Sequence, residues 1–151
     1  MYGDHEYGFG NSRPESFTKL PPLLKETAVA NQGNLGVEAF AELVVDSIQD
    51  IKGKKIVRID LREVEDSPAD FFIVCEGDSL VQVRAIAENV RKRARDEFGE
   101  RTSKVEGLQT GNWLCLDFFD TVVHVFNPDM RDFYDLESLW GDAPSTSYED
   151  L

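Results

Sequence analysis

Basic residues and long apolar runs are both scarce in this sequence of 151 residues. It has 16 lysines and arginines against 29 aspartates and glutamates, which gives a formal net charge of −13. Such a charge argues against broad, sequence-independent binding to nucleic acid, because phosphates repel an acidic surface. No apolar stretch approaches the roughly 20 residues that a membrane-spanning helix needs. The first residues also lack the apolar core of a signal peptide and the arginine-rich character of a transit peptide. We therefore expect a cytoplasmic protein with no membrane segment.

Motifs for metals and cofactors are missing as well. Cys75 and Cys115, the only two cysteines, lie in apolar strand-like runs without a CxxC or Cys/His pattern. They are typical of small buried hydrophobic residues, and the sequence offers no ligand set for structural zinc. The sequence has no Walker loop, GxGxxG, GxSxG or HExxH motif. We expect no cofactor and no metal ion.

A Ser-His-Asp site is the one nucleophilic arrangement that the sequence could supply. Ser67 or Ser79 would act with His124 and Asp117. His124, however, lies in the row VVHVF, which has the composition of a buried strand. A single histidine in such a row is more often a packed or interface residue than a catalytic base.

The sequence has no regular spacing of apolar residues before Val37 and has one after it. Residues 1–36 contain glycine, proline, asparagine and serine without sustained periodicity, so we expect a flexible extension. From Val37 to Ile51 apolar residues recur at helical spacing, which predicts an amphipathic helix. Residues 56–62 alternate between apolar and charged, as in a half-exposed strand. The unbroken apolar run 71–75 predicts a strand covered on both faces, near the centre of a sheet.

A second helix and a β-hairpin follow. Ser79 and Gln82 match a capping box, and the helix they begin should end at Gly99. After a weak strand at 102–108, the apolar runs 113–118 and 122–126 flank a linker short enough for a hairpin.

The end of the chain predicts one more short helix. Asn127-Pro128 should stop the last strand and begin a helix with Asn127 as its N-cap. This order of elements predicts an α/β (α+β) domain: a mixed sheet of about five strands with flanking helices. We place the domain at 37–143 and a flexible acidic tail at 144–151.

Carboxylates near the central strand raise the alternative of a metal-dependent nucleotidyltransferase. Such enzymes place acidic ligands around two metal ions, usually as Asp-x-Asp after a glycine-serine turn. Here Asp70 precedes the strand, but Phe72 stands at the second ligand position, and the glycine-serine turn is absent. Asp117 could add one carboxylate. Since the set lacks a ligand, we expect that the protein is not an enzyme.

Three segments together resemble the ribosomal silencing factor family, also called RsfS or Iojap-like. They are SPADFFIVCEGDSLVQVRAIAENV at 67–90, KVEGLQTGNWLCLDFFDTVVHVF at 104–126 and RDFYDLESLWGDA at 131–143. The chain departs from the family pattern at Glu76, where a serine is common, and at Phe119, where a glycine often precedes the aspartate.

The resemblance implies a fold related to nucleotidyltransferases but without their catalytic set. It implies binding to the large ribosomal subunit through its protein fourteen, at the face that the small subunit would join. The bound factor obstructs joining and so lowers translation under nutrient limitation or in stationary phase. Family members also form homodimers when off the ribosome. On the basic residues of the second helix we expect at most a minor contact with ribosomal RNA.

An acidic domain with an aromatic-rich patch suits a basic ribosomal protein, because buried aromatics supply binding energy and complementary charge speeds encounter. Carrying the family pattern onto this sequence, we expect the docking surface at nine residues. They are Trp113, Asp117, Asp120, Val122, His124, Tyr134, Leu136, Glu137 and Trp140. For the apolar members the competing interpretation is plain core packing.

Overall fold

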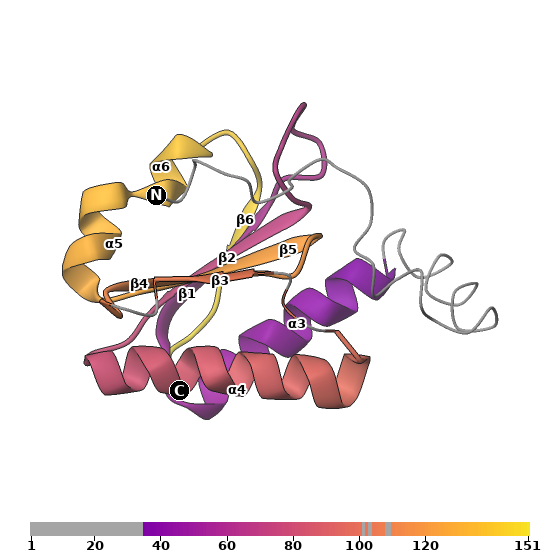
Figure 1. Ribbon diagram of the computed structural model, residues 1–151. Coiled ribbons are helices and arrows are strands. Elements are labelled where there is room, and N and C mark those ends of the chain that lie inside the picture. Colours follow the sequence, from indigo (N-terminus) through magenta and orange to yellow (C-terminus); the bar gives the residue numbers. More distant parts are fainter. Residues whose placement is uncertain (1–34, 101, 103, 108–109) are drawn as a thin grey trace.

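The computed structural model describes residues 35–151 except 101, 103, 108 and 109. These residues form a sheet with two long helices against one face and two short helices against the other (Figure 1). The mixed α/β architecture predicted from the sequence is confirmed. Of the extension expected at 1–36, residues 1–34 lie outside the described residues, and residues 35 and 36 begin the first described helix.

Six strands of the described chain form the sheet, in the order β3-β4-β5-β2-β1-β6. Their bounds are β1 Lys54–Asp60, β2 Phe71–Glu76, β3 Lys104–Glu106, β4 Trp113–Asp117, β5 Thr121–Phe126 and β6 Ser145–Ser147. β2 is parallel to β5, and the other neighbouring pairs are antiparallel. The apolar run 71–75 lies in β2, which is buried throughout and flanked by strands on both sides. Its predicted central place is confirmed.

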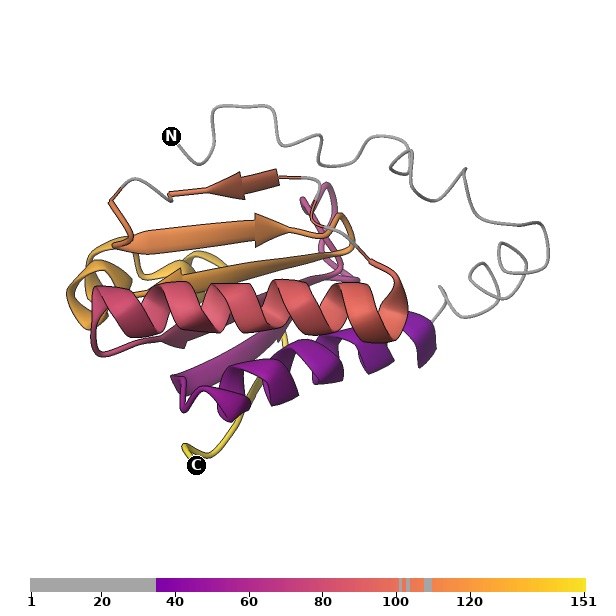
Figure 2. The same cartoon turned by 60° about the horizontal axis from the view of Figure 1, so that its bottom comes forward.

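Two long helices, α3 (Leu35–Asp50) and α4 (Leu80–Phe98), lie side by side across one face of the sheet (Figure 2). Ser79 caps α4, since its side chain accepts a hydrogen bond from the Gln82 backbone N–H at 3.1 Å. The Gln82 side chain accepts in turn from the backbone N–H of Asp78. In a standard capping box it would accept from the N–H of the N-cap residue itself, Ser79. Gly99, with φ 68°, ends the helix as predicted.

Side chains alternate along the strands and divide the core into two apolar clusters. The first faces α3 and α4 and includes Phe71, Ile73 and Val123. The second faces the short helices and includes Phe72 and Phe126. The second face is the one that concerns function, because the predicted docking residues are concentrated there.

The short helices are α5 (Pro128–Tyr134) and α6 (Leu136–Leu139). Asn127 caps α5 as predicted, since its Oδ1 accepts from the backbone N–H of Met130 at 2.9 Å. The sequence predicted one helix here. The structure has two, because Asp135 adopts a left-handed backbone conformation with φ 49° between them.

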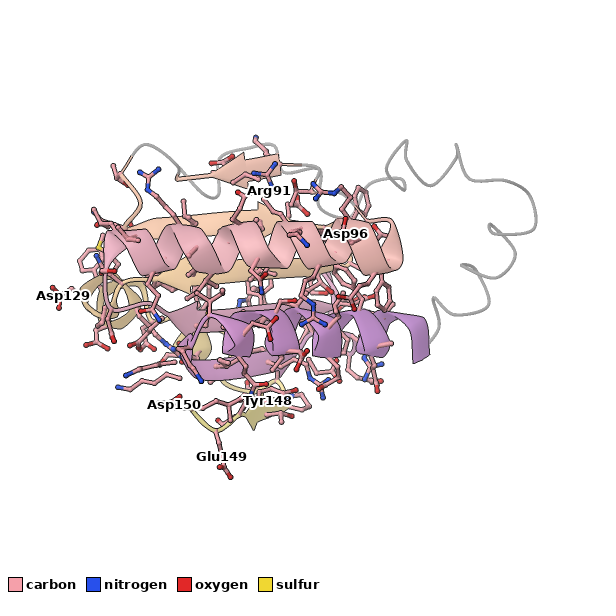
Figure 3. All side chains as sticks on the ribbon, turned by 90° about the horizontal axis from the view of Figure 1, so that it is seen from below. Arg91, Asp96, Asp129, Tyr148, Glu149 and Asp150 are labelled. Atoms are coloured by element: carbon pink, nitrogen blue, oxygen red, sulfur yellow. The ribbon has the colours of Figure 1, made fainter. Side chains whose placement is uncertain are left out.

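The last residues differ from the prediction. β6 pairs antiparallel with β1. The backbone N–H of Asp60 donates to the carbonyl of Pro144 at 2.8 Å, and that of Tyr148 donates to the carbonyl of Ile56 at 2.9 Å. The Tyr148 side chain lies beside α3 (Figure 3) and donates to Glu42 at 2.7 Å. The sheet therefore extends to residue 147, four residues beyond the position at which we placed the end of the domain.

Four acidic residues recur at four-residue spacing along α3: Glu38, Glu42, Asp46 and Asp50. Glu38 lies 2.9 Å from Arg62, and Glu42 lies 2.8 Å from Arg58. The last two bind Arg93 of α4 at 2.7 and 2.9 Å. On α4 itself, Lys92 lies 3.2 Å from Asp96, which Figure 3 labels on the exposed side of the helix. These pairs reduce the positive charge that α4 offers to phosphates, and the RNA contact expected there stays a prediction.

Candidate partner-binding surface

Aromatic rings gather where β4 and β5 meet α5 on the second face of the sheet. Trp113 lies in the middle, with its ring centroid 4.9 Å from Phe126 in a stacked arrangement and 4.3 Å from Tyr134. Phe133 extends the row, edge-on to Tyr134 at 5.1 Å. We call Trp113, Phe126, Phe133 and Tyr134 the aromatic cluster. Its rings run from the buried sheet to the surface of α5, so it is continuous with the core.

His124 of β5 lies in the core beside the aromatic cluster and contacts Trp113. It is fully buried, and its Nδ1 accepts a hydrogen bond from the indole N–H of Trp113 at 3.1 Å. Burial disfavours the charged imidazole and lowers the pKa of His124 from 6.5 to about 3. The histidine is therefore neutral near pH 7 and packed in the core, which is one of the two roles, packed or interface residue, that its sequence context favoured over a catalytic base.

The two serines considered with His124 have structural roles. The Ser67 hydroxyl lies 3.1 Å from the carbonyl oxygens of Leu61 and Ala69, and Ser79 caps α4. Neither observation favours a Ser-His-Asp site.

Phe72, which stands where a nucleotidyltransferase would have its second metal ligand, packs its ring into the core. Phe72 lies 4.7 Å from His124 and 5.9 Å from Trp140 between ring centroids. No three His, Cys, Asp or Glu side chains of the described residues are placed to hold a metal ion. Within the same residues, no helix has the length and apolar character needed to cross a bilayer.

Four of the nine predicted docking residues are buried: Asp117, Val122, His124 and Leu136. Val122 and Leu136 belong to the second apolar cluster. Asp117 accepts a hydrogen bond from the backbone N–H of Phe119 at 2.7 Å and so holds the start of the hairpin linker. In this structure the four side chains lie beneath the surface and support it.

The other five residues reach the surface in different places. Trp113 and Trp140 are half-buried, and Tyr134 is 36% exposed. Glu137 is half-buried and accepts a hydrogen bond from Arg131 at 2.6 Å. Asp120 lies in the linker that follows β4, at the opposite end of that strand from Trp113. The structure therefore brings four of the five together around α5 and α6 and leaves Asp120 apart.

Two exposed apolar residues on these helices were not predicted. Phe133 on α5 is 76% exposed, and Leu139 on α6 is 68% exposed. Between residues 127 and 143 the acids are Asp129, Asp132, Asp135, Glu137 and Asp142, and the single base, Arg131, is buried. The exposed side of α5 and α6 is thus apolar and acidic. It is our candidate for the contact with a partner, and from here on we use the name docking surface for this side of the two helices.

The hairpin linker contains a strained residue at a position noted in the sequence. Phe119, where the family pattern often has glycine, has φ 83°. Non-glycine residues rarely adopt such values because the side chain crowds the backbone. The departure from the family pattern therefore falls on a position whose backbone favours glycine.

The fold and this surface define a class: a mixed α/β domain that presents an apolar, acidic surface suited to a basic macromolecular partner. Comparison with known proteins gives the family. The sequence model described as "Ribosomal silencing factor during starvation" matches residues 36–151. The chain belongs to the ribosomal silencing factor family, as its three resembling segments implied.

Individual relatives agree with this assignment. The ribosomal silencing factor RsfS of Halalkalibacterium halodurans is 39% identical over 112 residues, which are 74% of this chain and 94% of the relative. A crystal structure of a Chromobacterium violaceum protein has a TM-score of 0.66 at 38% identity, covering 70% of this chain and 86% of that one. The mouse protein named mitochondrial assembly of ribosomal large subunit protein 1 is 32% identical over 73 residues, 47% of this chain and 32% of its own length.

Membership in this family supports a ribosome-associated role in regulating translation. The family is one of silencing factors and not a known family of enzymes.

Proposed function

We propose that this protein binds the large ribosomal subunit through its protein fourteen and sterically blocks joining of the small subunit. Translation then falls under nutrient limitation or in stationary phase. The observation that carries the proposal is the family match over residues 36–151, whose description names silencing of the ribosome during starvation. The name of the mouse relative, which refers to assembly of the large ribosomal subunit, supports that subunit as the partner.

The docking surface supports a protein partner in preference to RNA. Its exposed charged side chains are acids, which repel phosphates and attract a basic protein surface. Phe133, Tyr134 and Leu139 supply exposed apolar area beside them. Aromatic side chains at the centre of an interface commonly carry most of its binding energy.

Three further properties belong to the proposal. The protein acts in the cytoplasm, where ribosomes are found. It forms a homodimer when off the ribosome, and on the ribosome any contact with RNA is minor. Steric exclusion needs no chemistry, so the effect on translation is expected to follow occupancy of the site.

Co-sedimentation tests the partner. The protein is mixed with isolated large subunits, with and without small subunits, and bound protein is measured in the pellet. We expect saturable binding to large subunits alone and loss of bound protein when intact ribosomes are formed first. Light scattering then follows subunit joining, which the protein should inhibit in proportion to its occupancy and reversibly on dilution. Equal binding to isolated small subunits, or inhibition that persists after dilution, would contradict the proposal.

A further inference from the structure

Arg131 is a buried base beneath the docking surface. It lies on α5 just before the exposed residues Asp132 and Phe133, yet only 7% of its surface is exposed. A guanidinium presents several N–H donors in a rigid plane, so one arginine can fix several acceptors at once. A buried arginine with several partners is therefore suited to joining elements that are distant in sequence.

Three elements contribute acceptors to this guanidinium. Nη1 donates to the carbonyl oxygen of Lys55 in β1 at 2.5 Å and lies 3.4 Å from Oε2 of Glu76 in β2. Nη2 donates to Oε2 of Glu137 in α6 at 2.6 Å. Arg131 thus ties α5 to the sheet on one side and to α6 on the other.

The sheet is locally irregular where it accepts Arg131. The pairing of β1 with β2 shifts between Lys54 and Val57, and Lys55 has φ 52°. Such a bulge takes a residue out of the regular ladder. The backbone carbonyl of Lys55 accepts from Arg131, and the backbone N–H of Lys55 donates to the side chain of Asp150 at 2.8 Å. The irregularity therefore supplies an acceptor that a regular strand would use in its ladder.

The join between α5 and α6 depends on the same residue. The two helices meet at Asp135, whose left-handed backbone changes the direction of the chain. The backbone N–H of Asp135 donates to the carbonyl of Arg131 at 2.8 Å, and Glu137 in the first turn of α6 holds the Arg131 side chain. Because α6 has only four residues, it has little helical stability of its own. Its direction depends on contacts such as this one.

We propose that Arg131 is the positioning residue of the docking surface: it fixes α5 and α6 on the sheet in the arrangement that the large subunit recognises. This inference rests on the proposed function. Glu137, expected from the sequence to touch the partner, then acts through Arg131. Glu76, where this chain departs from the family pattern, adds a buried acidic partner to the arginine.

The test separates positioning from general stability. Arg131→Met alone leaves Glu76 buried without its cation, which is strongly destabilising, whereas removing both charges leaves no uncompensated charge in the core. The decisive variant is therefore the full chain with Arg131→Met and Glu76→Gln together. We expect its unfolding midpoint to lie closer to that of the wild type than the single variant's does. Its dissociation constant for large subunits should still rise about tenfold or more, a change of about 1.4 kcal/mol.

Arg93→Met is the matched control. Like Arg131, Arg93 has three acceptor groups, here the carboxylates of Asp46, Asp50 and Glu97, but it lies on α4 against the other face of the sheet. It should alter stability without altering affinity for large subunits. If the paired variant is folded and binds with wild-type affinity, or if Arg93→Met weakens binding equally, the assignment of Arg131 is wrong.

A double-mutant cycle decides the role of Glu137. If Glu137 acts through Arg131, Glu137→Ala, which removes the acceptor, should weaken binding in the wild type and add little to the paired variant. A direct contact residue would weaken binding by the same factor in both backgrounds, which would overturn this role.

Acrylamide quenching gives a readout that does not depend on the ribosome. The only two tryptophans, Trp113 and Trp140, both lie next to α5 and α6. Quenching should increase in the paired variant and stay unchanged in Arg93→Met. If wild-type protein fails to bind large subunits, the proposed function fails, and quenching still decides whether Arg131 positions the two helices. Unchanged quenching in the paired variant would overturn the inference.

Discussion

The indole nitrogen of Trp113 lies 3.1 Å from Nδ1 of His124, and this contact determines which nitrogen of the histidine carries hydrogen. An indole N–H can only donate, so Nδ1 accepts and the neutral ring holds its hydrogen on Nε2. A charged imidazole would carry hydrogen on both nitrogens and could not accept this bond. The position of Trp113 in the aromatic cluster is therefore linked to the charge of His124.

We expect His124→Gln to reduce the loss of stability in acid. The pKa of His124 is lowered to about 3 in the folded protein, against 6.5 for the free side chain. Between these values the unfolded chain binds a proton that the folded chain does not, so folding stability falls as pH falls. The cost is about 1.4 kcal/mol for each pH unit in that window. Glutamine does not titrate, and its side-chain oxygen can still accept from Trp113.

Urea unfolding at about pH 7, 6 and 5 measures this difference. Wild type and variant share all other titrating groups, so a difference between them in how the free energy of unfolding changes with pH is due to His124. If the two proteins lose stability in parallel over this range, burial does not keep His124 neutral in the folded state.

Phe119 offers a test of backbone strain in the hairpin linker. At ordinary positions alanine is more stable than glycine by about 0.5–1 kcal/mol. At φ 83° the order should reverse, because a Cβ atom is strained there and glycine is not. Both Phe119→Gly and Phe119→Ala remove the ring, so their difference isolates the backbone.

We expect Phe119→Gly to be more stable than Phe119→Ala by about 1 kcal/mol in thermal or urea unfolding. The same pair at Glu88, exposed within α4, serves as the control and should show the usual preference for alanine. Alanine proving the more stable at position 119 would mean that the linker relaxes to a different backbone conformation.

The elements that the sequence predicted well have local signals. β2 is an unbroken apolar run, and α4 has a capping serine and a terminal glycine, so their side chains alone indicate the structure. β6 has no such signal, because Ser145–Ser147 are exposed and the strand is held through backbone hydrogen bonds to β1. An edge strand of this kind depends on a partner more than 80 residues away in sequence.

Which residues of α5 and α6 are exposed could be predicted only in part, for a related reason. The segment 131–140 contains enough apolar residues to cover either side of a helix, and the sequence does not show which side faces the core. Arg131 decides this, because it points inward to Glu76 and leaves Phe133 exposed. A charged residue is normally expected at the surface, and its burial follows from a partner 55 residues away.

Phe133→Ala should therefore test the docking surface better than Trp113→Ala. Trp113 packs against Phe126, Tyr134 and His124, so its removal should lower stability as well as binding. Phe133 is mostly exposed, and its loss should change stability by no more than about 0.5 kcal/mol. As an interface aromatic it should contribute about 2 kcal/mol to binding, roughly 30-fold in affinity for large subunits.

Val81→Ala is the control for Phe133→Ala. Val81 is 78% exposed at the start of α4, a helix that covers the face of the sheet opposite α5 and α6 (Figure 1), and its truncation should leave binding unchanged. Co-sedimentation gives the affinity, and thermal unfolding gives the stability. A folded Phe133→Ala variant that binds as tightly as Val81→Ala would place the contact with the ribosome elsewhere on the molecule.

The charge of the docking surface should act mainly on the rate of association. Asp132 is exposed on α5, and Asp132→Lys changes the local charge by two units without removing a buried contact. Complementary charges speed encounter over a distance set by the Debye length, about 10 Å at 0.1 M salt and about 3 Å at 1 M. We expect the association rate constant with large subunits to fall at low salt and the dissociation rate constant to change little. The difference from wild type should shrink as salt rises.

Glu88→Lys is the control, because it makes the same change in charge at an exposed position of α4. It should have a smaller effect, since α4 covers the opposite face of the sheet (Figure 1). Stopped-flow measurements at several salt concentrations give both rate constants. Equal effects of the two variants would show that the total charge of the protein, and not the acidic docking surface, steers it to its partner.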